Sequence, residues 1–283
     1  MAVSGPSGGQ SARKKFFLFE GIETIIRNGN LIRHLTYREV SSRYRGTHLG
    51  ILWSLATPLL MLGVYTLVFG GIFKGRFGNG RDNSPIDFAL GLFCGINLFN
   101  LFAEVVQGSP RLVLSNPNYV KKVVFPLEIL SVVSVLSAFF HFIVANIPLI
   151  IGIEIAHQTF AISFLYLVPL VIPLMLGTLG LSWFLASIGV FIRDLHSAVA
   201  PMLTILMFLS AVFYSISAVP EFARRVLAIN PMAQLIEITR NAVVWGIAPD
   251  WRIVFDLYGL SIAVFVFGLW VFRSCKTAFA DAL

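Results

Sequence analysis

The chain has 283 residues, of which 57% are hydrophobic and only 12% are charged, whereas soluble domains carry about 25% charged residues. With 26 Phe and a mean hydropathy of +0.83, a soluble globule would expose large apolar patches, so that class is excluded. The net charge of +7 could indicate nucleic-acid binding. However, the basic residues flank apolar runs, where anionic lipid attracts them, so we expect membrane lipids and no nucleic acid as partners.

The N-terminal part of the chain precedes the first long apolar run. Residues 1–15 are small, polar and basic, and we expect a disordered segment without a cleavable signal. In residues 16–48, Phe19, Ile22 and Ile26 recur at helical spacing beside charged residues, which predicts an amphipathic helix in the headgroup plane. The alternative is an ordinary basic flank that sets the topology.

Six apolar runs are each long enough to cross a hydrocarbon core of about 30 Å. They are continuous and lack the alternation of barrel strands. The sequence therefore predicts an all-α integral membrane protein with a transmembrane domain over 49–273 and a short tail over 274–283. The predicted spans cover residues 49–73, 88–108, 129–153, 162–192, 195–219 and 253–272.

The basic residues orient these spans. Fourteen of the 21 Lys and Arg residues lie in segments on the N-terminal side of the membrane and seven on the other side. Short cytoplasmic segments carry the positive excess, and six spans place both termini on one side. We expect cytoplasmic N- and C-termini.

A cytoplasmic loop over residues 109–127 is broken by Pro110, Pro117 and Pro126. Asn116 and Pro117 form a helix-start signal, and residues 118–124 could form a short helix below the membrane. Such a helix would show Tyr119 on one face and Lys121 and Lys122 on another, as docking to a partner protein requires. A solvated connector is the alternative, and composition does not decide between them.

The outer segment over residues 220–251 is too apolar for a free loop. Its apolar residues mark one helical face before Asn230 and Pro231 and another after them. Each half is too short to span, so we expect two amphipathic helices that dip into the outer leaflet.

Polar residues are sparse within the spans. Asn97, Asn100 and Glu104 recur on one helical face, and this stripe either faces a water-filled passage or bonds a neighbouring helix. His141 is central in the third span, where we expect it to form a hydrogen bond between helices.

Aromatic residues gather in the outer halves of two spans. They either face lipid as an interfacial belt or form a ring of aromatic faces on which sugar rings can stack. The residues are Tyr65, Phe69 and Phe73 in the first span and Phe208, Phe213 and Tyr214 in the fifth.

Catalytic motifs are not found in the sequence. The glycine-rich stretch over residues 70–80 lacks the Lys-Ser/Thr pair of a phosphate-binding loop. The chain is therefore not expected to be an enzyme or to bind a cofactor or metal, and ATP used for transport must be hydrolysed by another chain.

Four strings together resemble the membrane subunit of type-2 ABC exporters for bacterial polysaccharides, most of all the O-antigen exporter permeases, with teichoic acid and capsule permeases as relatives. They are REVSSRYRGTHLGILWSLATPLL (38–60), NPNYVKKVVFPLEIL (116–130), FIRDL (191–195) and INPMAQLIEITRNAVVWG (229–246). The resemblance implies a homodimer in the bacterial inner membrane with two copies of an ATPase that binds ATP and Mg. A lipid-diphosphate-linked polysaccharide would pass between the two permeases.

Residue roles follow from the same resemblance. The ATPase-coupling helix would contain Asn116, Asn118, Tyr119, Lys121 and Lys122. Arg38, Arg43 and Arg45 would lie at the cytoplasmic entrance, where basic groups suit a diphosphate-linked lipid. The helices of 220–251 would match re-entrant helices at the outer face.

Two other functions remain open. One is an ABC permease for a drug, lipid or other small-molecule cargo. The other is a membrane-embedded glycosyltransferase or polymerase, which would need positioned carboxylates that the outer loops do not offer in close pairs.

Overall fold

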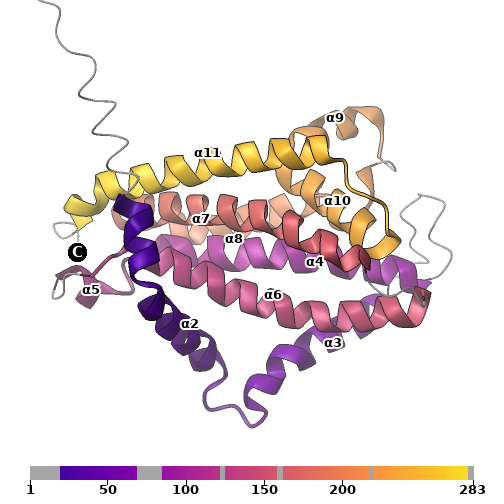
Figure 1. The fold of residues 1–283 in the computed structure, drawn as a ribbon, viewed down its shortest axis with the longest axis horizontal. Helices are drawn as coiled ribbons and strands as arrows, with labels where there is room; N and C mark the ends of the chain where they lie inside the picture. The colour runs from indigo at the N-terminus through magenta and orange to yellow at the C-terminus, as the bar shows by residue number, and fades with distance from the viewer. Residues whose placement is uncertain (1–19, 69–84, 122–124, 158–161, 217–218, 280–283) are drawn as a thin grey trace, which may run out of the picture.

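The computed structural model describes residues 20–68, 85–121, 125–157, 162–216 and 219–279. Within these ranges the chain is helical and contains no strand. Long helices run along the longest axis of the molecule (Figure 1). The predicted all-α architecture is therefore confirmed.

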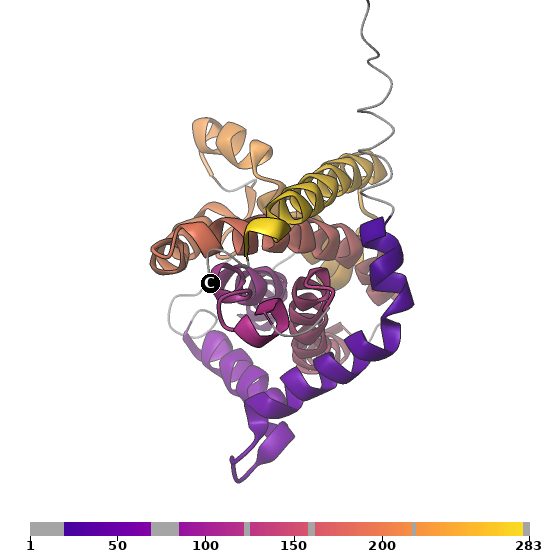
Figure 2. The ribbon, with the colours of Figure 1, turned by 90° about the vertical axis from the view of Figure 1, so that its left-hand side faces the viewer.

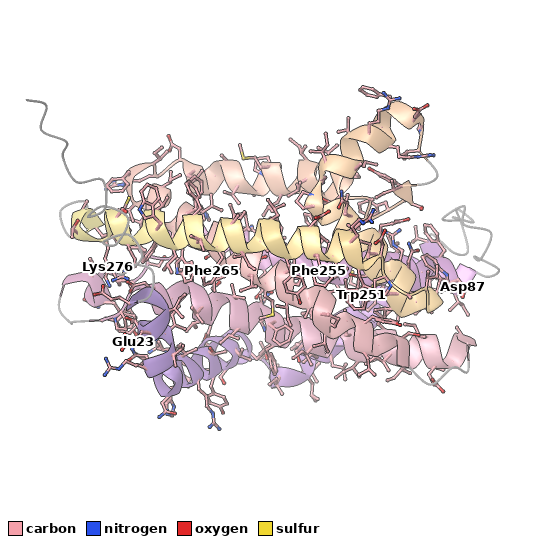
Figure 3. The ribbon with its side chains drawn as sticks, turned by 45° about the horizontal axis from the view of Figure 1, so that its top comes forward. Glu23, Asp87, Trp251, Phe255, Phe265 and Lys276 are labelled. Carbon is pink, nitrogen blue, oxygen red and sulfur yellow. The ribbon has the colours of Figure 1, made fainter. Side chains whose placement is uncertain are left out.

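Five of the helical stretches are long and apolar enough to cross a membrane. They contain α3 (Trp53–Tyr65, preceded by the 3-10 turn Gly50–Leu52), α4 (Pro85–Gly108), α6 (Glu128–His157), α7 (Leu167–Phe191, preceded by the 3-10 helix η4, Ile162–Tyr166) and α11 (Trp251–Cys275, followed by the 3-10 turn Lys276–Ala278). They match five of the six predicted spans. Trp251 and Lys276 mark the two ends of the α11 stretch in Figure 3, with Phe255 and Phe265 between them.

The fifth predicted span, over residues 195–219, is wrong as one continuous helix. Helix α8 covers only Leu195–Leu209, and its 15 residues extend about 22 Å, short of the hydrocarbon core. The helix stops because Ala211 leaves the helical region, with a φ of 53°, and the Asn230 amide takes the Leu209 carbonyl as its acceptor. A run of apolar residues carries no sign of such a turn.

The two short helices predicted after this turn are confirmed as α9 (Glu221–Ile229) and α10 (Pro231–Trp245). Asn230 separates them, and its side-chain oxygen accepts from the Met232 N–H over 2.9 Å, which caps α10. Its amide also donates to the Leu209 carbonyl over 2.8 Å. The break is therefore covered by the end of α8.

The N-terminal part of the structure is helical over residues 20–27, and α2 (Gly29–Tyr44) follows after Asn28. Ile32 and Leu35 pack against Ile129 and Val133 of α6. Helices α2 and α3 form a V along one side of the bundle (Figures 1 and 2), and both contact α6. Phe19, on which the predicted amphipathic face partly depended, lies outside the described residues.

Both described ends of the chain lie at the same end of the bundle, beside the short helix α5 (Pro117–Lys121). Arg273 Nη2 lies 2.8 Å from Glu20 Oε2. We call this the α5 end. Figure 3 shows Lys276 and Glu23 at this end and Asp87 at the opposite one.

Helix α4 forms the centre of the bundle. Of its most apolar stretch, 78% is buried, whereas none of the α3 stretch is. Helices α7 and α11 make the most extensive helix contact among the described elements, and a Cβ on Gly268 would overlap the Gly180 carbonyl oxygen. Small residues allow such close approach between helices in a membrane.

Candidate functional site

The loop predicted to dock a partner contains α5 and the 3-10 turn η3 (Ser109–Arg111). The Asn116 carbonyl accepts from the Tyr119 N–H over 3.1 Å, and Asn116 Nδ2 donates to the Leu112 carbonyl over 2.9 Å. Asn118 is exposed. The Lys121 side chain and Lys122 lie outside the described residues. The short helix that the sequence predicted begins at Pro117.

Tyr119 lies against the bundle. Its ring stacks on Phe125 at 4.3 Å between centroids, and its hydroxyl accepts from Arg38 Nη2 over 3.0 Å. This placement favours a role for Tyr119 in anchoring α5, and leaves Asn118 free to contact a partner.

A charged cluster joins α2 to the central helices. Arg43 Nη1 donates to Glu104 Oε1 over 2.6 Å, and His141 Nδ1 lies 2.9 Å from the same oxygen. The His141 side chain is 14% exposed. The expected interhelical hydrogen bond of His141 is thus present, with Glu104 of α4 as its partner and with Arg43 added from α2.

The polar stripe of α4 meets both of the alternatives that the sequence left open. All three residues line one cavity. Asn97 is buried and also donates to the Ala145 carbonyl of α6 over 3.1 Å, and Glu104 also bonds His141 of α6. Asn100 is exposed.

This central cavity has a volume of about 590 Å³ and lies between the α2–α3 V, α4 and α6. Polar and aromatic side chains line it, among them Trp53, Asn100, Glu104, His141 and His196. The buried atoms His141 Nε2 and His196 Nδ1 have no hydrogen-bond partner among the described residues. Buried polar atoms are normally paired, so this cavity suits water or a polar ligand.

A second cavity of about 430 Å³ lies nearer the α5 end. Because Arg38 of α2 and Arg111 of η3 line it together with Tyr119 of α5, we call it the arginine cavity. Glu104 and Gly108 line both cavities. The charged cluster therefore stands between them.

The three arginines assigned to the entrance have different environments. Arg38 lines the arginine cavity, Arg43 is paired with Glu104, and Arg45 is exposed in the turn after α2 and lines neither cavity. Sequence reasoning missed Arg111, since only the packing of α2 against α6 brings Arg38 to the cavity that Arg111 lines.

The aromatic residues fall into separate groups. The Phe208 and Phe213 rings lie 5.3 Å apart, and the Tyr214 hydroxyl donates to the Phe208 carbonyl over 2.7 Å. Tyr65 is half-buried at the end of α3. Phe69 and Phe73 lie outside the described residues, so the proposed ring stays a prediction.

A buried ion-pair network at the α5 end was not predicted. Glu128, whose side chain is 3% exposed, accepts from Lys276 Nζ over 2.9 and 3.0 Å. Arg273 Nε lies 3.7 Å from Glu128 and Arg273 also pairs with Glu20. The network ties α6 to α11 and to the helical residues 20–27.

We expect Glu104→Gln to loosen α2 and α3. The neutral amide weakens the bond to Arg43, and because Arg43 is exposed the loss is about 1 kcal/mol. Hydrogen exchange of residues 43–57 should accelerate about fivefold. Asn100→Ala, which lines the same cavity from the same helix, is the control. Equal exchange in the two variants would show that the cluster does not hold the V in place.

The sequence is similar to known membrane transport proteins over most of its length. Residues 30–244 match the ABC-2 type transporter family. The chain is 28% identical to the "O-antigen export system permease protein RfbA" of Myxococcus xanthus over 256 residues, which cover 89% of this chain and 95% of the relative. It is 25% identical to a protein of the same name from Klebsiella pneumoniae, with 90% and 95% covered. It is 23% identical to the "Polysialic acid transport protein KpsM" of Escherichia coli, with 87% and 94% covered.

The family match covers most of the chain, including α2, the long helices α4, α6 and α7, and the α9–α10 pair. The chain belongs to the ABC-2 type transporter family.

Proposed function

We propose that this protein is the permease half of an ATP-driven exporter that moves a lipid-linked polysaccharide of the O-antigen type across the bacterial inner membrane. The observation that carries the proposal is the similarity to O-antigen export permeases over 95% of their length. ABC-2 permeases are multi-pass membrane subunits without an ATPase domain, and they pair with an ATPase subunit. ATP and Mg would be bound by that partner.

The proposed topology has six spans, with α8 and the turn after it as the fifth. The ion pair between Glu20 and Arg273 supports it, because two ends on one side require an even number of crossings. Both termini would be cytoplasmic. Helices α9 and α10 would enter and leave the outer leaflet, with the Asn230 break protected by Leu209.

The proposed channel lies between two copies of the permease. Helix α3 buries none of its apolar stretch, and Met202, Ile205 and Phe208 of α8 are exposed. Lipid alone could cover these faces. However, the helices of one bundle are too few to surround a passage wide enough for a polymer. Tyr65 and Phe208 would contribute aromatic faces to that wall, on which sugar rings slide without tight binding.

The proposed ATPase contact is α5, with Asn118 and the two lysines that follow it. We expect the charge reversal Lys121→Glu/Lys122→Glu to lower copurification of the ATPase and surface polysaccharide by about tenfold or more, since interfacial like charges cost several kcal/mol. Arg224→Glu/Arg225→Glu, on exposed α9 at the opposite end, is the control. An ATPase that copurifies normally with the lysine variant would refute the coupling role.

The nature of the cargo is tested separately. Similarity to a polysialic acid transporter favours a capsule-type polymer as the second candidate. Deletion of the gene should remove one polymer from the cell surface, and its sugar composition distinguishes O-antigen, capsule and teichoic acid. An unchanged set of surface polymers would favour a small-molecule cargo instead.

A further inference from the structure

The charged cluster of Arg43, Glu104 and His141 contains three mutual contacts that cannot all be hydrogen bonds at the same time. Arg43 Nη1 lies 3.0 Å from His141 Nδ1 and 2.6 Å from Glu104 Oε1, and His141 Nδ1 lies 2.9 Å from that same oxygen. A ring nitrogen either carries a hydrogen and donates or carries none and accepts. Nδ1 can therefore accept from Arg43 or donate to Glu104, but it cannot do both.

The number of protons on the His141 ring decides which of these two bonds is available. Neutral imidazole with its hydrogen on Nε2 accepts from Arg43 at Nδ1, whereas the imidazolium carries a hydrogen on both nitrogens and only donates. A proton on His141 thus strengthens the contact with Glu104 and leaves two cationic N–H groups 3.0 Å apart, where like charges repel. The bond that is lost is the one that joins α2 to α6.

The surroundings of His141 give a proton access to the ring. His141 lines the central cavity, and its buried Nε2 has no hydrogen-bond partner among the described residues. A polar cavity of about 590 Å³ has room for water, which can carry a proton to this nitrogen. Histidine is the side chain whose charge ordinarily changes between about pH 5 and 8.

The other ionisable groups near His141 come from three elements. Arg43 and Tyr44 approach it from α2, Tyr44 with its ring edge-on at 5.9 Å between centroids. Glu104 approaches from α4, and His196 of α8 lines the same cavity. The residues of α3 that line this cavity have no ionisable side chain. Arginine stays charged and tyrosine stays neutral between about pH 5 and 8, so a change of pH in this range can act on the two histidines and on Glu104.

We propose that His141 is a proton-sensitive latch for α2, which works through the contact of its Nδ1 with Arg43. Neutral His141 accepts from Arg43 and so holds α2, and the α3 that follows it, against α4 and α6. A proton on His141 repels Arg43 and loosens this V. The attachment of the V is therefore stronger at pH 8 than at pH 5.5. The inference concerns the permease alone and does not depend on its cargo.

The test is hydrogen exchange of residues 43–57 in the full-length protein, in nanodiscs of phosphatidylcholine at about pH 8 and about pH 5.5. Each rate is divided by the intrinsic rate of an unfolded peptide at the same pH, which removes the direct effect of pH on exchange. We expect the protection of these residues to fall about fivefold at the lower pH, the loss expected for one partly exposed hydrogen bond to a charged group.

Three variants assign the effect to a residue. His141→Asn keeps an oxygen that can accept from Arg43 at the place of Nδ1 but cannot take up a proton, so its protection should be native at the higher pH and unchanged at the lower one. Arg43→Gln should give low protection at both pH values, because the guanidinium that the latch holds is absent. His196→Gln is the control, and it should lose protection at the lower pH as the native protein does.

Equal protection of the native protein at the two pH values would overturn the inference. A His141→Asn variant that still loses protection would do the same, since Glu104 or His196 would then be the titrating group. Should the asparagine variant fail to fold, a native-sized pH effect in Arg43→Gln, or none in His196→Gln, would equally refute the latch. Polymer export is not measured, so none of these results bears on the proposed function.

Discussion

Gly268→Ala is expected to separate helices α7 and α11 and to lower the stability of the folded protein by about 3 kcal/mol. The added Cβ would overlap the carbonyl oxygen of Gly180, which is backbone and cannot rotate away. The helices must therefore move apart along the most extensive contact in the described bundle. To measure the effect, the detergent-solubilised protein is heated, and the fraction that remains monodisperse on gel filtration is followed with temperature. The variant should have a lower melting temperature than the native protein.

The same substitution elsewhere in α11 provides the control. A Cβ on Gly259 meets no atom within 4 Å, and alanine favours a helix over glycine by about 1 kcal/mol. Gly259→Ala should therefore be neutral or slightly stabilising. If both variants melted alike, close packing at Gly268 would not support the fold.

The long helices could be predicted from the sequence because their signal is local. A stretch such as the one that forms α6 is apolar for long enough to need a membrane or a core, whatever surrounds it. The end of α8 could not be predicted, since it depends on the Asn230 amide that reaches back to Leu209. That contact joins residues 21 positions apart, and composition at either position carries no sign of it.

The candidate site shows the same limit. The spacing of Asn97, Asn100 and Glu104 correctly placed these residues on one face of α4, where all three line a cavity, but could not say which of them would also bond α6. Arg43 and Glu104 are 61 positions apart, and Arg38 and Arg111 meet at one cavity from different elements. Such pairs are set by how α2 folds over the bundle, which the basic composition of that segment does not determine.

Glu128→Gln is expected to release the C-terminal end of α11 from α6. The substitution keeps the size of the side chain but removes the charge that Lys276 Nζ and Arg273 Nε approach. Because Glu128 is buried, the loss removes the carboxylate from Lys276 and one of two from Arg273, which keeps Glu20. Since Lys276 is partly exposed, the cost is about 2 kcal/mol. The helical residues 20–27, held through Arg273, should exchange amide hydrogens faster in this variant.

A double-mutant cycle separates the ion pair from simple loss of packing. Adding Lys276→Met to Glu128→Gln removes both partners, and the second change should cost less than it does in the native background, because the unpaired ammonium is gone. Glu23→Gln is the control, since its pair with Arg27 is exposed and contributes about 0.5 kcal/mol or less. Strictly additive effects of the two changes would contradict the pairing. Strong coupling in the cycle would instead show that the pair holds the start of α6 to the C-terminal end of the α11 stretch.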